Sequence, residues 1–192
     1  MSGVFAQVTM SLDGFTTGPD DGPDHPLGEG GSALHRWILD EAKTPPDVQV
    51  GAEMMADAGA FVMGRRMADI GLPLWGPDGA FGKPCFIVTH RPAPPLVKGP
   101  TTFTYCAGGL EAALTSARAA ANGQRVCIVG GAEVVRQALA LGHLDELRLD
   151  IAPILLGGGR ALFQGLEIPG TLTPTRVLES PLATHITYRI HA

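Results

Sequence analysis

Residues 126–141 have the sequence VCIVGGAEVVRQALAL, in which an apolar run, a pair of glycines and a helical segment follow one another directly. The run Val126–Val129 is short, rich in β-branched residues and bounded by glycine, which predicts a buried strand. Gly130 and Gly131 predict a tight turn, and residues 132–141 predict a helix. A strand that turns at once into a helix is the repeating unit of a sheet covered by helices.

The same kind of unit is expected on both sides of this segment. Strands are predicted at residues 4–10, 60–63, 85–89, 101–105 and 126–129, and helices at 32–43, 50–58, 110–121 and 132–141. The end of the chain predicts strands without intervening helices, at residues 144–151, 175–179 and 184–190. We therefore expect an α/β fold with a mixed, mostly parallel central sheet, flanking helices and antiparallel C-terminal strands, in one domain spanning residues 1–192.

The composition excludes several classes of protein. The 192 residues are 45% hydrophobic and only 17% charged, with a net charge of −5, which excludes a disordered chain and gives no basic surface for nucleic acid. No run of about eighteen apolar residues predicts a membrane span. Three cysteines without a CxxC pair, and a start without signal-peptide features, indicate a cytoplasmic protein with reduced thiols. The histidines lack metal-ligand spacing, so no metal is expected.

Three segments share one arrangement, a strand followed at once by a turn or a helix start. They are FVMGRR at 61–66, IVTHR at 87–91 and IVGGAEV at 128–134. A glycine lets a ligand approach the backbone, a helix N-terminus favours phosphate, and arginine matches phosphate oxygens. Each segment alone also fits a surface helix start, a turn or a strand-to-helix bend. Together, at one edge of a sheet, they predict a site for a long anionic cofactor.

In this order, MGRR, VTHRP and VGGAEV resemble the dihydrofolate-reductase fold. MSLDGF (10–15) and PILLGGGRALF (153–163) are similar to the reductase half of the bacterial bifunctional riboflavin-biosynthesis deaminase–reductase and to its stand-alone relatives. This resemblance implies NADPH as the hydride donor and a homodimer. It also implies reduction of a pyrimidine-type substrate like 5-amino-6-(5-phosphoribosylamino)uracil.

The resemblance also implies which residues bind the cofactor. They are Thr16 and Thr17 beside the nicotinamide; Gly64, Arg65 and Arg66 at the 2′-phosphate and pyrophosphate; Thr89, His90 and Arg91 beside the adenine ribose; and Gly130, Gly131, Ala132, Glu133 and Val134 around the pyrophosphate and ribose. The glycine pair of such proteins is commonly joined by a cis peptide bond, so one is expected between Gly130 and Gly131.

Asp13 is the acid of MSLDGF (10–15), the opening motif, and it has two interpretations. As the candidate catalytic residue, it orients a polar substrate or relays a proton beside the nicotinamide. Alternatively it caps a turn, because Asp-Gly is a common turn pair. The sequence leaves both open.

Two departures from the relatives leave the substrate open. The helix expected at 32–43 carries its acids, Asp40 and Glu41, late, so no residue matches the acid with which dihydrofolate reductases bind the pterin ring. The chain also lacks a deaminase zinc motif. Reduction of dihydrofolate, another pterin or a small carbonyl or imine is therefore an alternative, and so is an NADP-binding module without catalysis.

Overall fold

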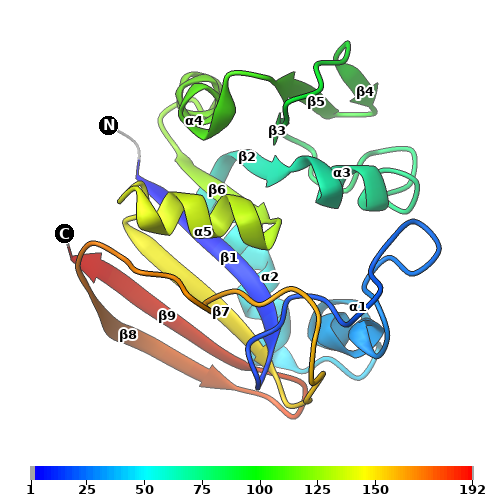
Figure 1. The fold of residues 1–192 in the computed structure, drawn as a ribbon, viewed down its shortest axis with the longest axis vertical. Helices are drawn as coiled ribbons and strands as arrows, with labels where there is room; N and C mark the ends of the chain where they lie inside the picture. The colour runs from blue at the N-terminus through cyan, green and yellow to red at the C-terminus, as the bar shows by residue number, and fades with distance from the viewer. Residues whose placement is uncertain (1–2, 192) are drawn as a thin grey trace.

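The structure, a computed structural model, describes residues 3–191 and contains one nine-stranded sheet with helices on both faces (Figure 1). The strands are β1 (Val4–Ser11), β2 (Ala58–Gly64), β3 (Pro84–Val88), β4 (Leu96–Lys98), β5 (Thr101–Cys106), β6 (Arg125–Gly130), β7 (Glu146–Ala152), β8 (Thr171–Glu179) and β9 (Thr184–His191). The helices are η1 (Gly31–His35), α1 (Arg36–Leu39), α2 (Pro45–Asp57), α3 (Arg65–Gly71), α4 (Gly109–Ala120) and α5 (Ala132–Ala140).

The strands follow the order β4-β5-β3-β2-β6-β1-β7-β9-β8 across the sheet. Pairing is parallel from β5 through β3, β2, β6 and β1 to β7, whereas β4, β9 and β8 pair antiparallel with their neighbours. The central position of β6 agrees with its buried, β-branched sequence. The predicted fold, a mostly parallel sheet with an antiparallel C-terminal end, is confirmed.

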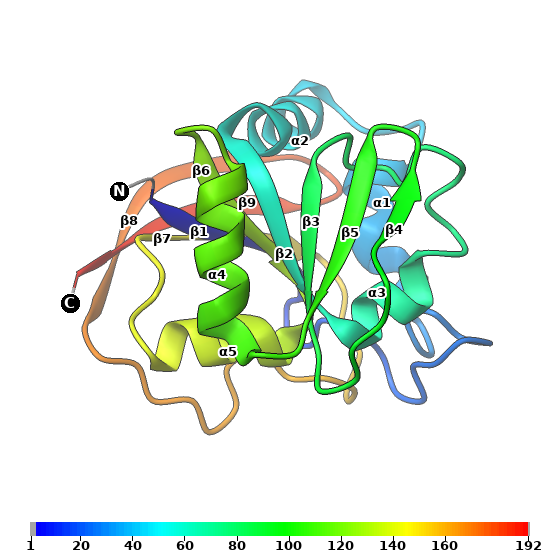
Figure 2. The ribbon, with the colours of Figure 1, turned by 90° about the horizontal axis from the view of Figure 1, so that it is seen from above.

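The two larger hydrophobic cores of the described residues lie on opposite faces of the sheet. Helices α4 and α5 cover one face and α2 covers the other (Figure 2). The alternation of β1 sends Val4, Ala6 and Val8 into the core under α4 and α5, and Phe5 into the core that includes Phe61. Because both faces are covered, the central strands are apolar along most of their length.

The helix predicted at residues 32–43 is shorter and less regular in the structure. A 3-10 turn, η1, is followed by the four-residue helix α1, which ends at Leu39. The next residue, Asp40, has an extended backbone, and its carboxylate accepts hydrogen bonds from Arg36 Nε and Ala42 N, both at 2.9 Å. An aspartate that bonds to nearby backbone in this way competes with the helix, which explains the early end.

Helix α2 begins earlier than predicted. Pro45 and Pro46 occupy its first turn, where the missing N–H of proline leaves no intrahelical bond unmade. Thr44 and Asp47 form a capping box, in which Asp47 Oδ2 accepts from Thr44 N at 2.7 Å. The two prolines therefore stand at the start of α2 and bring its first turn forward to residue 45.

A buried histidine connects the start of α2 to the last strands. His185 on β9 is 5% exposed, with Nδ1 2.6 Å from Asp150 Oδ1 and Nε2 3.1 Å from Asp47 Oδ1. Ser180 Oγ donates to the same oxygen of Asp47 at 2.6 Å. Burial lowers the pKa of His185, but the hydrogen bonds and charges of Asp150 and Asp47 outweigh it, so the pKa is raised.

Because the pKa of His185 is raised, its stabilising contribution is complete below the ordinary histidine value of 6.5 and is lost as the pH rises through the raised value. We expect His185→Gln to reduce the free energy of unfolding by about 3 kcal/mol near pH 6. The difference from the wild type should shrink toward alkaline pH. Urea unfolding across this range measures both proteins, and a difference that does not change with pH would contradict a protonated His185.

A second histidine, His35, has the opposite pH dependence. Burial lowers the pKa of His35, so its contribution to stability is lost as the pH falls, opposite to that of His185. The contribution of His185 is therefore the one that is lost toward alkaline pH.

Candidate functional site

The residues predicted to bind a cofactor lie where the parallel strands end. Arg65 follows β2, Thr89 follows β3, and Gly131 follows β6. Asp13 follows the end of β1, and residues 153–160 follow β7. Because these strands are parallel, all five segments reach the same edge of the sheet, which is where open α/β sheets bind ligands.

Two glycines bring the start of α5 against the end of β2. A Cβ atom on Gly131 would lie 3.1 Å from the backbone nitrogen of Gly64, and one on Gly64 would lie 3.2 Å from Val134 Cγ2. Gly131 has φ 78° and ψ 98°, a conformation that favours glycine. The two glycines therefore let the main chain at the start of α5 approach the main chain at the end of β2.

The bond between Gly130 and Gly131 is trans, as are the other peptide bonds of the described residues, so the expected cis bond is wrong for this structure. The turn is made instead by positive φ at both glycines, 143° and 78°. No side chain caps the helix that follows at Gly131. The first amide groups of a helix lack intrahelical acceptors, and the positive end of its dipole favours an anion. The start of α5 therefore fits a phosphate group.

Arg65 and Arg91 gather with a carboxylate and an aromatic ring beside the ends of β3 and β5. Arg65 donates from Nε to Asp69 Oδ1 at 2.6 Å and from Nη1 to the backbone oxygen of Arg91 at 3.1 Å. Its guanidinium carbon lies 5.0 Å from the ring centroid of Tyr105. Arg91 Nη2 is 3.5 Å from Asp69 Oδ2, and its side chain is 75% exposed. The group offers two cations to an incoming anion.

Thr89 shapes the turn that carries Arg91. Its backbone nitrogen donates to the oxygen of Cys106 at 3.1 Å, and its Oγ1 accepts from Arg91 N at 3.0 Å. Thr89 is buried, whereas His90 beside it is exposed. Thr89 therefore positions its neighbours, and His90 and Arg91 are the accessible side chains of this turn.

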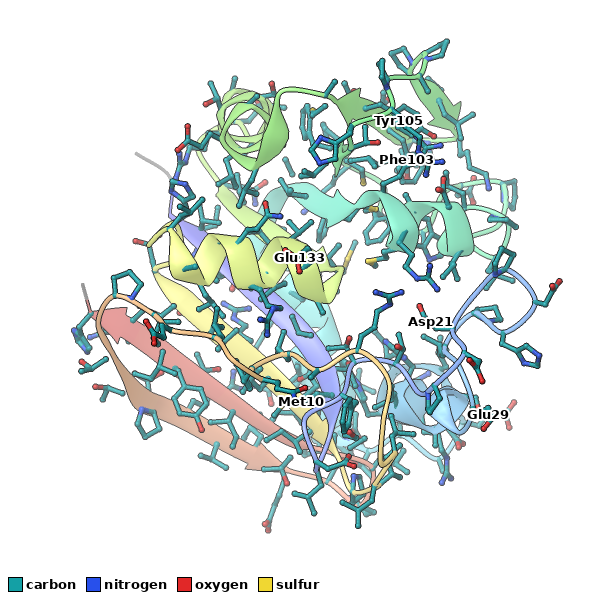
Figure 3. All side chains as sticks on the ribbon, in the orientation of Figure 1. Met10, Asp21, Glu29, Phe103, Tyr105 and Glu133 are labelled. Carbon is teal, nitrogen blue, oxygen red and sulfur yellow. The ribbon has the colours of Figure 1, made fainter. Side chains whose placement is uncertain are left out.

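Arg66 points to a different partner from Arg65. Its Nε donates to Asp21 Oδ2 at 2.5 Å, and its Nη2 donates to the backbone oxygen of Asp21. Arg160 Nε donates to both carboxylate oxygens of Asp21, at 3.1 and 3.0 Å. Burial raises the pKa of Asp21, but the bonds from Arg66 and Arg160 outweigh it and hold the pKa below its usual range. Figure 3 shows Asp21 on the loop between β1 and η1, close to α3.

Asp13 ties the opening motif to the loop after β7. Its carboxylate accepts from Ser11 Oγ at 2.5 Å, from Leu156 N at 3.1 Å and from Gly157 N at 2.7 Å. The bond from Ser11, together with those from the backbone, lowers the pKa of Asp13, which is therefore ionised at neutral pH. The carboxylate thus joins the segment after β1 to the loop after β7, and both interpretations of Asp13, the turn cap and the catalytic residue, stay predictions.

Thr16 and Thr17 lie beside the same loop. Thr16 donates to the backbone oxygen of Arg160 from its nitrogen at 2.8 Å and from its Oγ1 at 3.2 Å. Thr17 Oγ1 is buried and has no hydrogen-bond partner among the described residues. A buried hydroxyl without a partner is costly, so Thr17 retains the capacity to bond to a ligand.

Sequence reasoning missed four residues of this edge. Asp69 and Tyr105 contact Arg65, and Asp21 contacts both Arg66 and Arg160. Arg160 stood in a quoted motif, directly after the glycines of PILLGGGRALF, and the spacing of Arg65 and Asp69 by four residues is a local helix pattern. Asp21 and Tyr105 belong to no local pattern, because their contacts join distant segments.

Within residues 3–191, none of the helices is long and apolar enough to cross a membrane. In the same part of the chain, no three His, Cys, Asp or Glu side chains come together as metal ligands would.

Glycine turns and arginines along the carboxyl edge of a mostly parallel sheet are typical of α/β proteins that bind a ligand at that edge. The sequence matches the family model of the RibD C-terminal domain over residues 3–185, and the chain belongs to this family. The resemblance found from the motifs is thereby confirmed. Among curated proteins, no sequence matches this chain.

Solved structures share the fold. A protein named for riboflavin biosynthesis from Shewanella sp. PV-4 has 22% identity and a TM-score of 0.74, with 99% of each chain covered. A pyrimidine reductase-like protein from Corynebacterium diphtheriae has 16% identity and a TM-score of 0.63, covering 100% of this chain and 92% of that one. The deaminase/5-amino-6-(5-phosphoribosylamino)uracil reductase of Thermotoga maritima has 15% identity and a TM-score of 0.67, covering 99% of this chain and 57% of that one.

The close approach of Gly131 to Gly64 leads to a testable prediction about stability. Gly131→Ala places a Cβ against the Gly64 backbone and in an unfavourable conformation, whereas Gly123→Ala, at φ 82°, meets open space. We expect both variants to lose about 1 kcal/mol from the positive φ, and Gly131→Ala to lose about 1 kcal/mol more. Thermal and urea unfolding of the two variants measure the difference. Equal losses would mean that the contact with Gly64 relaxes without cost.

Proposed function

We propose that this chain is a single-domain NADPH-dependent reductase that transfers a hydride to a pyrimidine-type substrate like 5-amino-6-(5-phosphoribosylamino)uracil. Membership of the RibD C-terminal family supports a reductase. The observation that supports NADPH as the cofactor is the close approach of Gly64 and Gly131 at an uncapped helix start. Arg65 and Arg91 lie beside it. When bound, NADPH supplies the hydride, and the protein supplies binding and orientation.

Different residues of the edge would bind different parts of the cofactor. The segment Gly130–Val134 and Gly64 would bind the pyrophosphate and ribose through backbone groups. Arg65 and Arg91 would bind the 2′-phosphate, with the Tyr105 ring beside them. Thr16 and Thr17 would border the nicotinamide.

Arg66 is proposed to share the phosphate binding, although in this structure its guanidinium bonds to Asp21. Asp13 would hold the 153–157 loop in place beside the substrate and orient the polar groups that receive the hydride. Because its carboxylate is ionised, Asp13 orients or accepts a proton at neutral pH rather than donating one.

We further propose a homodimer in the cytoplasm. The described cysteines are free, and burial raises the pKa of Cys85 and of Cys127, which keeps both thiols protonated and unreactive. Free, buried thiols fit a reducing compartment.

The reaction itself is the first test of the proposed function. With 5-amino-6-(5-phosphoribosylamino)uracil and NADPH, we expect absorbance of the reduced nicotinamide to fall at a rate proportional to enzyme. Dihydrofolate, another pterin and small carbonyl compounds serve as parallel substrates for the alternative. Tight NADPH binding without oxidation by any of these compounds would favour the non-catalytic module.

Asp13 separates catalysis from cofactor binding. We expect Asp13→Asn to lower kcat at least about tenfold and to leave the Kd for NADPH unchanged. Ser11→Ala removes the hydrogen bond that lowers the pKa of Asp13, so the acid limb of the kcat profile should move to higher pH. A kcat that falls equally at every pH in Ser11→Ala would leave Asp13 a purely structural cap.

Cofactor preference is predicted to depend on Arg65. NADPH differs from NADH by its 2′-phosphate, and a hydrogen bond to a charged group contributes about 1.5–3 kcal/mol. We expect Arg65→Ala to weaken NADPH binding at least about tenfold and to leave NADH binding nearly unchanged. Arg189→Ala is the control for net charge, because Arg189 is exposed and lies opposite Glu146 in the β7–β9 register, at the end of β7 far from the carboxyl edge. Calorimetric titration measures both cofactors, and equal losses would place Arg65 at the pyrophosphate or in the fold.

A further inference from the structure

The loop of residues 18–29 closes on itself at its base. Gly18 N donates to Leu27 O, and Glu29 N donates to Pro19 O, both at 2.8 Å. Gly159 packs so closely on this base that a Cβ on it would lie 2.7 Å from the backbone carbon of Gly18. The base of the loop is therefore fixed to the glycine turn after β7 by main-chain contacts.

The outer part of the loop is held by one side chain. Among the described residues, every side-chain hydrogen bond that joins residues 18–29 to the rest of the protein involves Asp21. The neighbouring acids Asp20 and Asp24 are exposed and make no side-chain hydrogen bond there. In this part of the chain, the side-chain hydrogen bonds of the outer loop therefore run from Asp21 to Arg66 on α3 and to Arg160 after β7.

The two arginines around Asp21 have the chemistry of an anion site. Arg66 and Arg160 come from α3 and from the loop after β7, and each is 47% exposed while the carboxylate between them is 9% exposed. Guanidinium groups recognise carboxylate and phosphate oxygens with the same planar donors. Asp21 therefore occupies the place where the two arginines would hold the anionic group of a ligand.

The location of this pair connects it to the cofactor edge. Arg66 follows Gly64 and Arg65 at the end of β2, and Arg160 bonds through its backbone oxygen to Thr16. A phosphate bound here would lie between the opening motif and the start of α3. The loop that now covers the two arginines would have to move away.

We propose that Arg66 and Arg160 form a phosphate site that Asp21 fills in the ligand-free protein, and that a phosphate-bearing ligand displaces Asp21 and releases the loop of residues 18–29. This inference rests on the proposed function only in taking the phosphate from the cofactor or the substrate of the same edge. A phosphate monoester carries up to two negative charges against the single charge of Asp21, so it competes favourably for both arginines. Displacement costs affinity, because the apparent Kd rises with the fraction of molecules in which Asp21 is bound.

The test compares variants that open the loop in different ways. Asp21→Asn removes the internal anion, Asp24→Asn is the matched control in the same loop, and Arg66→Gln with Arg160→Gln removes the site. Calorimetry with inorganic pyrophosphate, NADP⁺ and ribose 5-phosphate measures binding. Hydrogen exchange of residues 18–29, with and without pyrophosphate, measures release of the loop.

We expect opposite effects on affinity and the same effect on the loop. Asp21→Asn should bind phosphate ligands at least about tenfold more tightly, and the double arginine variant at least about tenfold more weakly. Both should speed exchange of the loop, whereas Asp24→Asn should match the wild type in both measurements. Pyrophosphate should speed loop exchange in the wild type. If Asp21→Asn gains affinity only for NADP⁺, the site belongs to the cofactor. If it gains affinity only for ribose 5-phosphate, the site belongs to the substrate.

Faster loop exchange with unchanged phosphate affinity in both variants would overturn the inference and leave Asp21 a structural tie. If the wild type binds NADPH and reduces its substrate while Asp21→Asn gains no affinity, the phosphate site fails and the proposed function stands. If the wild type binds no NADPH but Asp21→Asn binds pyrophosphate more tightly, the site stands and the proposed function fails. Should Asp21→Asn not fold, wild-type loop exchange that pyrophosphate leaves unchanged overturns the inference by itself.

Discussion

Parallel pairing from β5 to β7 is the constraint on which the candidate site depends. Segments that lie far apart in the sequence must leave their strands at one edge, whatever their own local preferences. The approach of Gly131 to Gly64 follows from it, because β6 and β2 are neighbours and each turns directly into a helix. The uncapped start of α5 therefore faces the start of α3.

The two faces of β1 explain why regular helices, α4 and α5, cover one side of this strand and short helical pieces, η1 and α1, lie on the other. One face is apolar and packs under α4 and α5, which are regular helices. The other carries Gln7 and Thr9, which bond to Asp150 Oδ2 at 3.1 Å and to Trp37 Nε1 at 3.0 Å. A polar strand surface requires particular hydrogen-bond partners rather than a continuous apolar stripe. The short pieces η1 and α1 meet that requirement, since they bring Trp37 over Thr9.

The strand–helix units could be predicted from the sequence because apolar runs bounded by glycine report on burial directly. The predicted bounds of β6 and α5 agree with the observed ones to within one residue at each end. Features set by particular side chains could not be found in this way. Asp40 ends α1, and Pro45 and Pro46, in the first turn of α2, are equally compatible with a helix that has just ended. β4 has only three residues, too few for an alternating pattern. The glycines and Arg65 of the site were predictable as a local motif, whereas the partner of Arg66 lies 45 residues away.

The main-chain base of the 18–29 loop has a consequence for how proteins of this kind diverge. Its hydrogen bonds are between backbone atoms, and the tight packing involves glycines. Apart from Asp21, which bonds to Arg66 and Arg160, the side chains between Asp20 and Pro26 form no hydrogen bond with the rest of the described chain. Substitutions and small insertions there leave the folding of the rest of the chain intact. Exchange of a few residues at the tip can therefore change which ligand is preferred, while the base of the loop and the sheet stay the same.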